Sequence, residues 1–270
     1  MSSGLLARWQ RFREDRAVAR RPIRDDLWRR TLHRYPFLQR PDATDDAQLR
    51  RLASRFLDAK EFTAVGDIKL SNDVVVAVAA QACLPILQLG LQRYDGFVGI
   101  VLHADQVVAR REVSDDDGIV HEYTEVVSGE AMSGGPLMLS WKDVRVAGMS
   151  AATGYNVVIH EFAHVLDMAD GLADGMPLLP PGLSSSEWLV TLAHEREQLA
   201  QHVHEGGDTA LDPYGLQGPD EFFAVASEAF FVSPRRLRDE HPALYQMFTR
   251  FYLQDPAATS GHKRMQLTPE

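Results

Sequence analysis

Two histidines and a glutamate in one short segment have the spacing of a metal-dependent reaction centre. Residues 160–164 read His-Glu-Phe-Ala-His. On a helix, positions i and i+4 lie on the same face, so His160 and His164 can bind one metal ion. Glu161 is then placed to take a proton from a water that the metal activates. This spacing predicts a zinc-dependent hydrolase of peptide bonds.

The residues around the motif favour this interpretation over a chance match. Apolar side chains dominate on both sides of it, and no Pro or Gly interrupts residues 155–170. We therefore expect a buried helix over about 155–169, which holds the imidazoles in fixed rotamers. The alternative, that His160 and His164 are ordinary core histidines bonded to backbone groups, fits this context less well.

The third ligand of a catalytic zinc must come from elsewhere in the chain. Metzincins need a Gly three residues and a His six residues after the second histidine, but Asp167 and Asp170 occupy those positions. A carboxylate from a later helix is the alternative, and the candidates are Glu187, Glu195, Glu197, Glu205, Glu221 and Glu228. The first four fall where solvated helix faces or turns are expected.

Two of these glutamates occur in an otherwise apolar helix, where a carboxylate is costly unless a cation holds it. They are Glu221 and Glu228, seven residues apart on one face. Either is a possible ligand, and Glu228 is alternatively an acceptor for an imidazole N–H. Asp167 is a further candidate to orient a ligand imidazole, although an unrelated salt bridge fits it equally well.

The remaining pattern predicts an α+β protein. The elements that we expect are a helical region over 1–60; a buried helix over 74–90 that Pro85 kinks or divides; strands over 97–102, 107–109, 119–127 and 137–141; a short helix from 142; a loop over 171–185; helices near 186–204, 219–232 and 242–253; and a frayed tail over 255–270. The segment 135–141 is expected to form an edge strand on which an extended peptide can pair.

Composition and charge exclude several other classes. Hydrophobic content of 45% is ordinary for a soluble globular protein, and no apolar run approaches the roughly 20 residues of a membrane span. Cys83 is alone, so neither a disulfide nor a thiolate metal cluster can form, which favours a cytoplasmic setting. Residues 1–60 carry a net charge of +7 and the rest −17. Because acidic residues interleave with the arginines, direct nucleic-acid binding is not favoured.

The chain resembles a known family in several segments. These are G-Y-N-V-V-I-H-E-F-A-H-V-L-D-M at 154–168, D-P-Y-G at 212–215, D-E-F-F-A-V-A-S-E-A-F-F at 220–231, R-R-P-I at 20–23, A-A-Q-A-C-L-P-I-L at 79–87 and G-P-L-M-L-S-W at 135–141. Together they resemble the Mlc titration factor A family of gluzincin-like metallopeptidases over about residues 20–256. The zinc-binding portion of anthrax lethal factor is similar, with the same Tyr-to-Glu interval.

The resemblance implies one zincin-like domain over 1–270, with a mostly helical N-terminal region (1–60), and with a small mixed sheet and C-terminal metal-binding helices within 96–255. It implies one Zn²⁺ held by His160, His164 and Glu221, Glu161 as the catalytic carboxylate, and Tyr214 pointing into the site as an oxyanion donor. A turn tyrosine is the alternative for Tyr214.

The resemblance also implies two functions, which do not exclude one another. One is an aminopeptidase-type activity on short peptide substrates. The other is regulatory binding, in which the protein sequesters a transcriptional repressor like Mlc and so affects sugar phosphotransferase genes.

Overall fold

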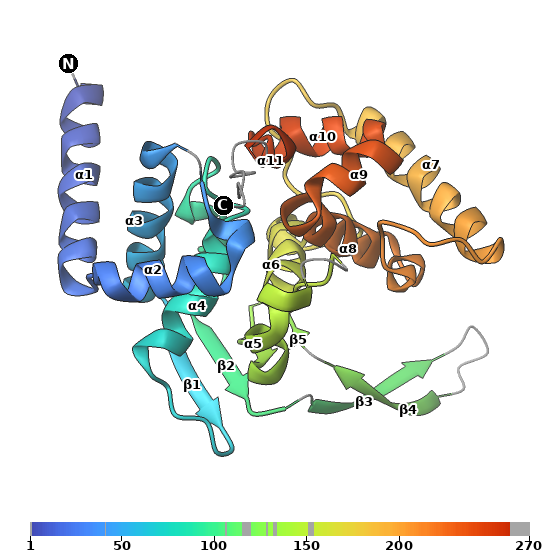
Figure 1. Ribbon diagram of the computed structural model, residues 1–270, viewed down its shortest axis with the longest axis horizontal. Helices are drawn as coiled ribbons and strands as arrows, with labels where there is room; N and C mark the ends of the chain where they lie inside the picture. Colours follow the sequence, from blue (N-terminus) through green and yellow to red (C-terminus); the bar gives the residue numbers. More distant parts are fainter. Residues whose placement is uncertain are drawn as a thin grey trace, which may run out of the picture.

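Helices make up most of the chain and surround a small mixed sheet (Figure 1). This computed structural model describes residues 2–40, 42–105, 107–114, 120–127, 129–131, 134–150 and 154–259. Its α-helices are α1 Ser2–Arg20, α2 Asp25–Arg34, α3 Ala43–Ala59, α4 Asn72–Cys83, α5 Trp141–Ser150, α6 Val157–Asp167, α7 Ser185–His204, α8 Pro219–Val232, α9 Pro234–Glu240, α10 Pro242–Tyr252 and α11 Pro256–Thr259. Four 3₁₀ turns join them, η1 Pro36–Leu38, η2 Leu91–Tyr94, η3 Met168–Asp170 and η4 Pro213–Leu216.

The main sheet has four strands in the order β1-β2-β6-β5. Its strands are β1 Glu61–Val65, β2 Gly99–His103, β5 Gly129–Glu130 and β6 Leu137–Ser140. The first three in spatial order are parallel, whereas β5 runs antiparallel to β6. A separate hairpin, β3 Val107–Ser114 with β4 Val120–Val127, projects from the body (Figure 1). This arrangement confirms the predicted α+β class with a mixed sheet.

The expected position of β6 at the edge of the sheet was wrong. Strand β6 pairs with β2 on one side and with β5 on the other, so its hydrogen-bonding groups are used on both sides. The end of the described sheet on this side is β5, whose Gly129 lies opposite Leu139. Any peptide that extends this side of the sheet therefore pairs with β5 rather than with β6.

The helix α6, which carries the His-Glu-Phe-Ala-His segment, passes through the centre of the molecule (Figure 1). Its Phe162 is fully buried among Phe56 of α3, Tyr94 and Phe97, with ring centroids 4.9 to 5.8 Å apart. The other side of α6 packs on α8. Helices from both ends of the chain thus fix the position of α6, because close apolar packing holds it on two opposite faces.

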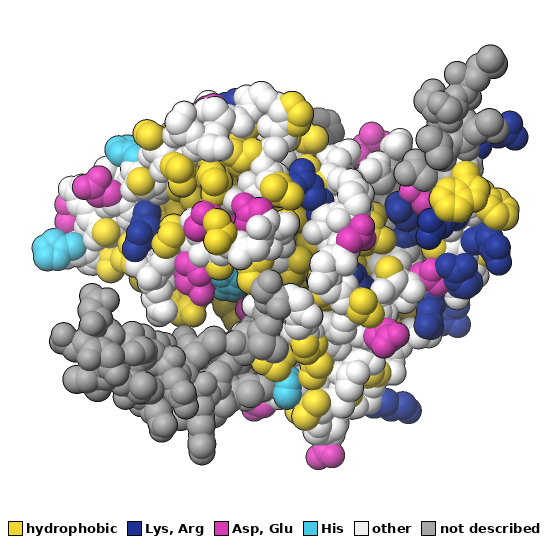
Figure 2. Space-filling view, turned by 180° about the vertical axis from the view of Figure 1, so that it is seen from behind, with side chains coloured by type: hydrophobic (Ala, Val, Ile, Leu, Met, Phe, Trp, Pro, Cys, Tyr) yellow, Lys and Arg dark blue, Asp and Glu magenta, His cyan; other side chains and the backbone are white. Residues whose placement is uncertain are grey.

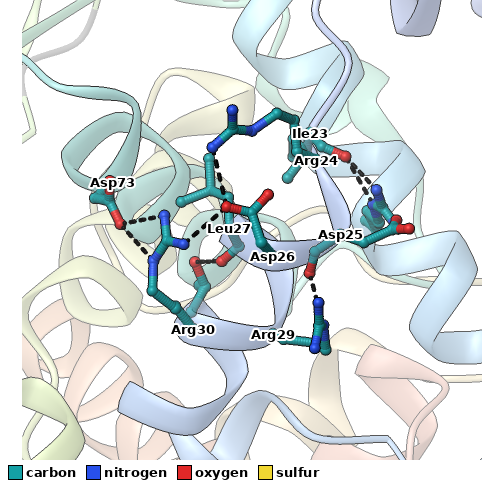
Figure 3. Close-up of polar contacts among 10 residues, drawn as sticks. Ile23, Arg24, Asp25, Asp26, Leu27, Arg29, Arg30 and Asp73 are labelled. Atoms are coloured by element: carbon teal, nitrogen blue, oxygen red, sulfur yellow. Dashed lines mark hydrogen bonds and ion pairs between the residues drawn. The ribbon is translucent and has the colours of Figure 1, made fainter.

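The basic N-terminal helices are held together by ion pairs. Arg30 of α2 lies between Asp26 of the same helix and Asp73 of α4, at 2.9 and 3.1 Å (Figure 3). Arg50 of α3 reaches Asp25 at 2.7 Å. Lys and Arg side chains nevertheless gather over this end of the molecule on the face shown in Figure 2. The interleaved acids therefore serve helix packing, as the sequence pattern indicates.

The other predicted elements differ from the structure mainly at their ends. Helix α4 stops at Cys83, two residues before Pro85, since proline cannot continue the hydrogen-bond ladder. Strand β1 and helix α9 were not predicted. Of the predicted strand 119–127, Ile119 lies outside the described residues, and so do residues 260–270 of the predicted tail. Among the described helices, none has the length and apolarity that a bilayer crossing requires.

Candidate metal centre

The beginning of α6 is fixed by a buried asparagine. Asn156 is the N-cap, and its Oδ1 accepts a hydrogen bond from the Ile159 N–H at 3.0 Å. Its side-chain amide donates to Gln81 Oε1 of α4 at 2.9 Å, and both residues are fully buried. Because the cap ties α6 to α4, the first turn, which contains His160, cannot fray.

Two histidines and a glutamate from different helices converge at the surface of α6. The Nε2 atoms of His160 and His164 lie 3.2 Å apart. Glu221 in the first turn of α8 places Oε2 at 3.0 Å from the first and 3.5 Å from the second. One ligand atom from each residue lies within 4.8 Å of the other two. The structure thus brings together the three side chains that the resemblance names as zinc ligands.

The hydrogen bonds around this cluster fit a cation at its centre. Glu228 Oε1 accepts from His160 Nδ1 at 2.7 Å, and its other oxygen accepts from the Asn156 N–H. With its proton on Nδ1, neutral His160 turns the Nε2 lone pair towards Glu221. Glu221 Oε2 is buried and has no hydrogen-bond partner of good geometry among the described residues. A metal ion between these atoms would satisfy all of them at once.

The pKa values show how strongly these charges interact. Burial alone lowers the pKa of His160, but its close contacts with the Glu221 and Glu228 carboxylates raise it well above the ordinary value. Burial raises the pKa of Glu221, yet the two histidines outweigh this effect and bring it down to about 2. Burial also raises the pKa of Glu228, against the bonds from His160 and Asn156. The pocket therefore stabilises a carboxylate at Glu221 together with positive charge beside it.

Glu161 is buried on the side of α6 that faces the sheet. Its burial raises its pKa to about 7, within the range of a proton acceptor that works near neutrality. A Cβ atom built at Gly129 of β5 would lie 2.5 Å from Glu161 Cγ and Oε1. Only glycine allows the β5 backbone to approach this carboxylate so closely. Nothing in the local sequence pattern marks Gly129 as part of the site.

Tyr214 lies beside the cluster, as the resemblance implies. Its ring centroid is 6.1 Å from that of His160. Asp212 caps the 3₁₀ turn η4 by accepting from the Tyr214 N–H at 2.9 Å. A Cβ at Gly215 would meet the Cα of Phe222 at 3.3 Å, so η4 packs closely on α8. The turn and the helix that carries Glu221 consequently form one unit.

Two roles were expected for Asp167, to orient a ligand imidazole or to form an unrelated salt bridge. Its contacts in the structure are different. It is fully buried, and its Oδ2 accepts from the Gly175 N–H at 3.0 Å, while Oδ1 has no partner among the described residues. Burial raises its pKa to about 6. A Cβ at Gly175 would meet the Pro219 carbonyl oxygen at 2.4 Å. Asp167 thus holds the loop that presses on the start of α8.

Of the other four candidate glutamates, Glu195 is not at the solvated position that the sequence suggested. Glu187, Glu197 and Glu205 are exposed, as expected for solvated positions. Glu195 is buried instead, and its Oε2 lies 2.7 Å from His241 Nδ1. Its partner, His241, lies at the start of α10. The sequence pattern does not predict that this part of the chain contacts α7. Glu195 is not a member of the metal cluster.

One face of the molecule is hollowed. Figure 2 shows magenta and cyan side chains around the hollow, with apolar side chains nearby. His160, His164 and Glu221 are exposed by 12, 13 and 20% of their side-chain areas. A small molecule can therefore reach the cluster, although most of each side chain is buried.

Comparisons with known proteins show which family the chain belongs to. A family model described as "Glucose-regulated metallo-peptidase M90" matches residues 8–253. The chain is 36% identical to Mlc titration factor A of Salmonella arizonae over 236 residues, 86% of this chain and 92% of the relative. It is 34% identical to Mlc titration factor A of Klebsiella pneumoniae over 234 residues, 86% and 87% of the two chains. The chain belongs to the M90 family of glucose-regulated metallopeptidases.

Proposed function

We propose that the protein is a zinc-dependent peptidase with His160, His164 and Glu221 as its metal ligands. The observation that carries this proposal is the convergence of two imidazole Nε2 atoms and one carboxylate oxygen within 4.8 Å of one another. Two neutral nitrogens with one carboxylate form the ligand set of many catalytic zinc sites. Membership of a metallopeptidase family supports the same conclusion.

Each protein side chain at the site is proposed to have its own role in the reaction. When bound, zinc supplies Lewis acidity to a water and to the substrate carbonyl oxygen. Glu161 takes a proton as the water oxygen attacks the carbonyl carbon, and later gives that proton to the departing amine nitrogen. Its buried position beside His160 and His164 and its raised pKa support this role. Glu228 holds His160 in one tautomer throughout.

Tyr214 is proposed to stabilise the negative charge that develops on the carbonyl oxygen. Its ring lies close to that of His160, and a phenol O–H is a suitable donor to an oxyanion. The substrate backbone is proposed to pair with β5, because Gly129 lies directly against Glu161. We further propose that short peptides, cleaved from the amino end, are the substrates, as the family resemblance implies.

We treat residues 1–270 as one zincin-like domain. The N-terminal helices support this view, because Phe56 of α3 packs on Phe162 of the motif helix at 5.6 Å. A core that includes residues from α2 through α10 also joins the two ends of the chain. Within such a domain, loss of the N-terminal region would loosen the metal centre itself.

A second candidate function is the binding of a transcriptional repressor. The relatives named Mlc titration factor A support it, since their name links them to Mlc. One protein can carry out both functions if the partner binds near the candidate metal ligands. The repressor-binding function does not need Glu161 as a proton acceptor.

One substitution separates the two functions. Zinc-loaded Glu161→Gln is expected to keep one metal per chain and to lose hydrolysis of a peptide mixture, while Glu187→Gln on exposed α7 hydrolyses it normally. Peptide cleavage by Glu161→Gln at the wild-type rate would overturn the peptidase mechanism. Repressor capture by both the wild type and Glu161→Gln would show that the repressor-binding function does not depend on hydrolysis.

A further inference from the structure

A cavity of about 320 Å³ borders the end of the motif helix, at Val165 and Met168, and is not used by the chemistry described above. Its walls come from four segments of the chain. The apolar lining residues are Phe97, Ala131, Leu137, Val165, Met168, Ala169 and Leu178, and the polar ones are Gln92, Arg93 and Asp95. The volume is at the lower end of the range for small-molecule sites, roughly 300–1,000 Å³. It is large enough to hold one bulky apolar side chain.

The motif helix connects the cavity to the proton acceptor. Residues i, i+4 and i+7 of a helix share one face, so Glu161, Val165 and Met168 follow one another along α6 and into η3. The ligands His160 and His164 form the neighbouring stripe, which faces α8. A substrate that lies along the first stripe passes from Glu161 to the cavity within about two helical turns.

The edge strand provides a second connection. Gly129 lies against Glu161, and Ala131 lines the cavity. Alternate residues of an extended chain point to the same side, so both face α6, about 7 Å apart. The backbone of 129–131 therefore runs from the reaction centre to the cavity, parallel to the stripe on the helix.

For a peptide that pairs antiparallel to β5, the direction of the strand determines which part of the substrate reaches the cavity. Strand β5 is antiparallel to β6, and a peptide that adds to its free side in the antiparallel sense runs from Ala131 towards Gly129. The substrate residue beside Ala131 thus precedes the residue beside Gly129 in the peptide. Since Glu161 acts beside Gly129, the cavity lies on the amino-terminal side of the bond to be cleaved.

The far wall of the cavity is held in place by polar contacts. Arg93 donates to the Leu178 carbonyl oxygen at 2.9 Å, which ties the η2 segment to the loop after α6. The buried Lys60 ammonium donates to the carbonyl oxygens of Tyr94 and Phe97, and lies 3.9 Å from the Phe97 ring centroid. These bonds fix the segments that form this wall, and the lining as a whole contains more apolar than polar side chains. A preformed, mainly apolar cavity favours an apolar guest.

We propose that this cavity is the specificity pocket for a large aliphatic or aromatic side chain on the amino-terminal side of the scissile bond. The inference rests on the proposed peptidase function and adds a substrate class to it. The assignment of this side chain follows from the positions of Val165 on α6 and Met168 in η3, which both lie beyond Glu161, and from the direction of β5. For a substrate cleaved after its first residue, that side chain belongs to the amino-terminal residue itself.

The test uses the zinc-loaded full chain and a mixture of peptides of random sequence, with the cleaved bonds identified by mass spectrometry. The wild type is expected to cleave after large apolar residues at least about tenfold more often than after Ala or Gly. Met168→Trp fills the cavity from η3, and Leu178→Trp fills it from the opposite loop. Both are expected to lower the ratio of cleavage after large apolar residues to cleavage after Ala from at least about tenfold to about one.

The control is Leu172→Trp, on the same loop but 60% exposed and outside the cavity lining. It is expected to keep the wild-type preference. The use of two filling variants protects the test against misfolding of either one. Zinc content and the melting temperature of each variant show whether it remains folded.

The outcomes separate this inference from the function on which it rests. No cleavage at all by the zinc-loaded wild type would overturn the peptidase assignment, and the pocket assignment with it. Cleavage without preference before the bond, or with a preference only after it, would overturn the pocket alone. An unchanged preference in folded Met168→Trp and Leu178→Trp would also overturn the pocket assignment alone.

Discussion

The Nδ1 atom of His160 and the Oε1 atom of Glu228 lie 2.7 Å apart in the largely buried space between α6 and α8. This bond sets the tautomer of the histidine and directs its Nε2 towards Glu221. The second oxygen of Glu228 accepts from the Asn156 N–H at the start of α6. One carboxylate thus orients a ligand and fixes the helix that carries it.

Glu228→Gln is expected to weaken zinc binding by about 10- to 100-fold. A glutamine side chain has one acceptor oxygen, so it can serve either His160 Nδ1 or the Asn156 N–H but not both. Zinc affinity is measured by competition with a chromogenic chelator. Exposed Glu187→Gln is the matched control, and equal affinity in the two variants would contradict the role of Glu228.

Gly129→Ala is expected to reduce kcat by about 100-fold while zinc remains bound. The added methyl group would lie 2.5 Å from the Glu161 carboxyl group and displace it, and misplacement of a catalytic group by 1 Å costs on this order. Gly207→Ala is the control, since its Cβ has a nearest neighbour at 3.4 Å. A Gly129→Ala enzyme with normal kcat would show that β5 does not approach Glu161.

Tyr214→Phe is expected to lower kcat by about 10²- to 10³-fold with little change in zinc content, because it removes one oxyanion donor. Tyr245→Phe is the control, since its hydroxyl group donates to Asp255 on another part of the surface. Steady-state kinetics on one peptide suffices for the comparison. A change in KM alone would assign Tyr214 to substrate binding instead.

Lys60→Met is expected to change how stability depends on pH. Burial lowers the pKa of Lys60 in the folded protein from 10.5 to about 8, so the unfolded chain binds more protons between these values. The contribution of Lys60 to the free energy of unfolding therefore rises with pH across this window.

Burial raises the pKa of Cys83 above 9.0, which acts in the opposite sense at higher pH. The Lys60 contribution is therefore the difference between the wild type and Lys60→Met, measured by urea unfolding from pH 7 to 10. Parallel curves for the two proteins would contradict a lowered pKa for Lys60.

Much of the metal centre could be predicted because its central features are local. The i, i+4 spacing of His160 and His164 and the apolar residues around them predict a buried helix, and α6 is such a helix. The choice between Glu221 and Glu228 could not be made from periodicity, since both lie on one face of α8. The distance from each carboxylate to the two nitrogens of His160 separates their roles.

The parts that could not be predicted depend on contacts between distant segments. Strand β5 has two residues, too few for an alternating pattern, and it exists because Gly129 and Glu130 pair with β6. Its absence from the predicted elements led to the wrong assignment of β6 as an edge strand. Glu195 is buried because His241, 46 residues later, reaches its carboxylate. Side-chain periodicity on α7 alone carries no information about that partner.

The most direct test of the metal centre is the zinc stoichiometry of the purified protein and of three single variants, His160→Ala, His164→Ala and Glu221→Ala. Elemental analysis after zinc loading and removal of free metal is expected to give one zinc per wild-type chain, and far less than one in each variant. Folding of each variant is checked by circular dichroism. A folded wild type without zinc, or three variants that each retain a full equivalent, would contradict the account.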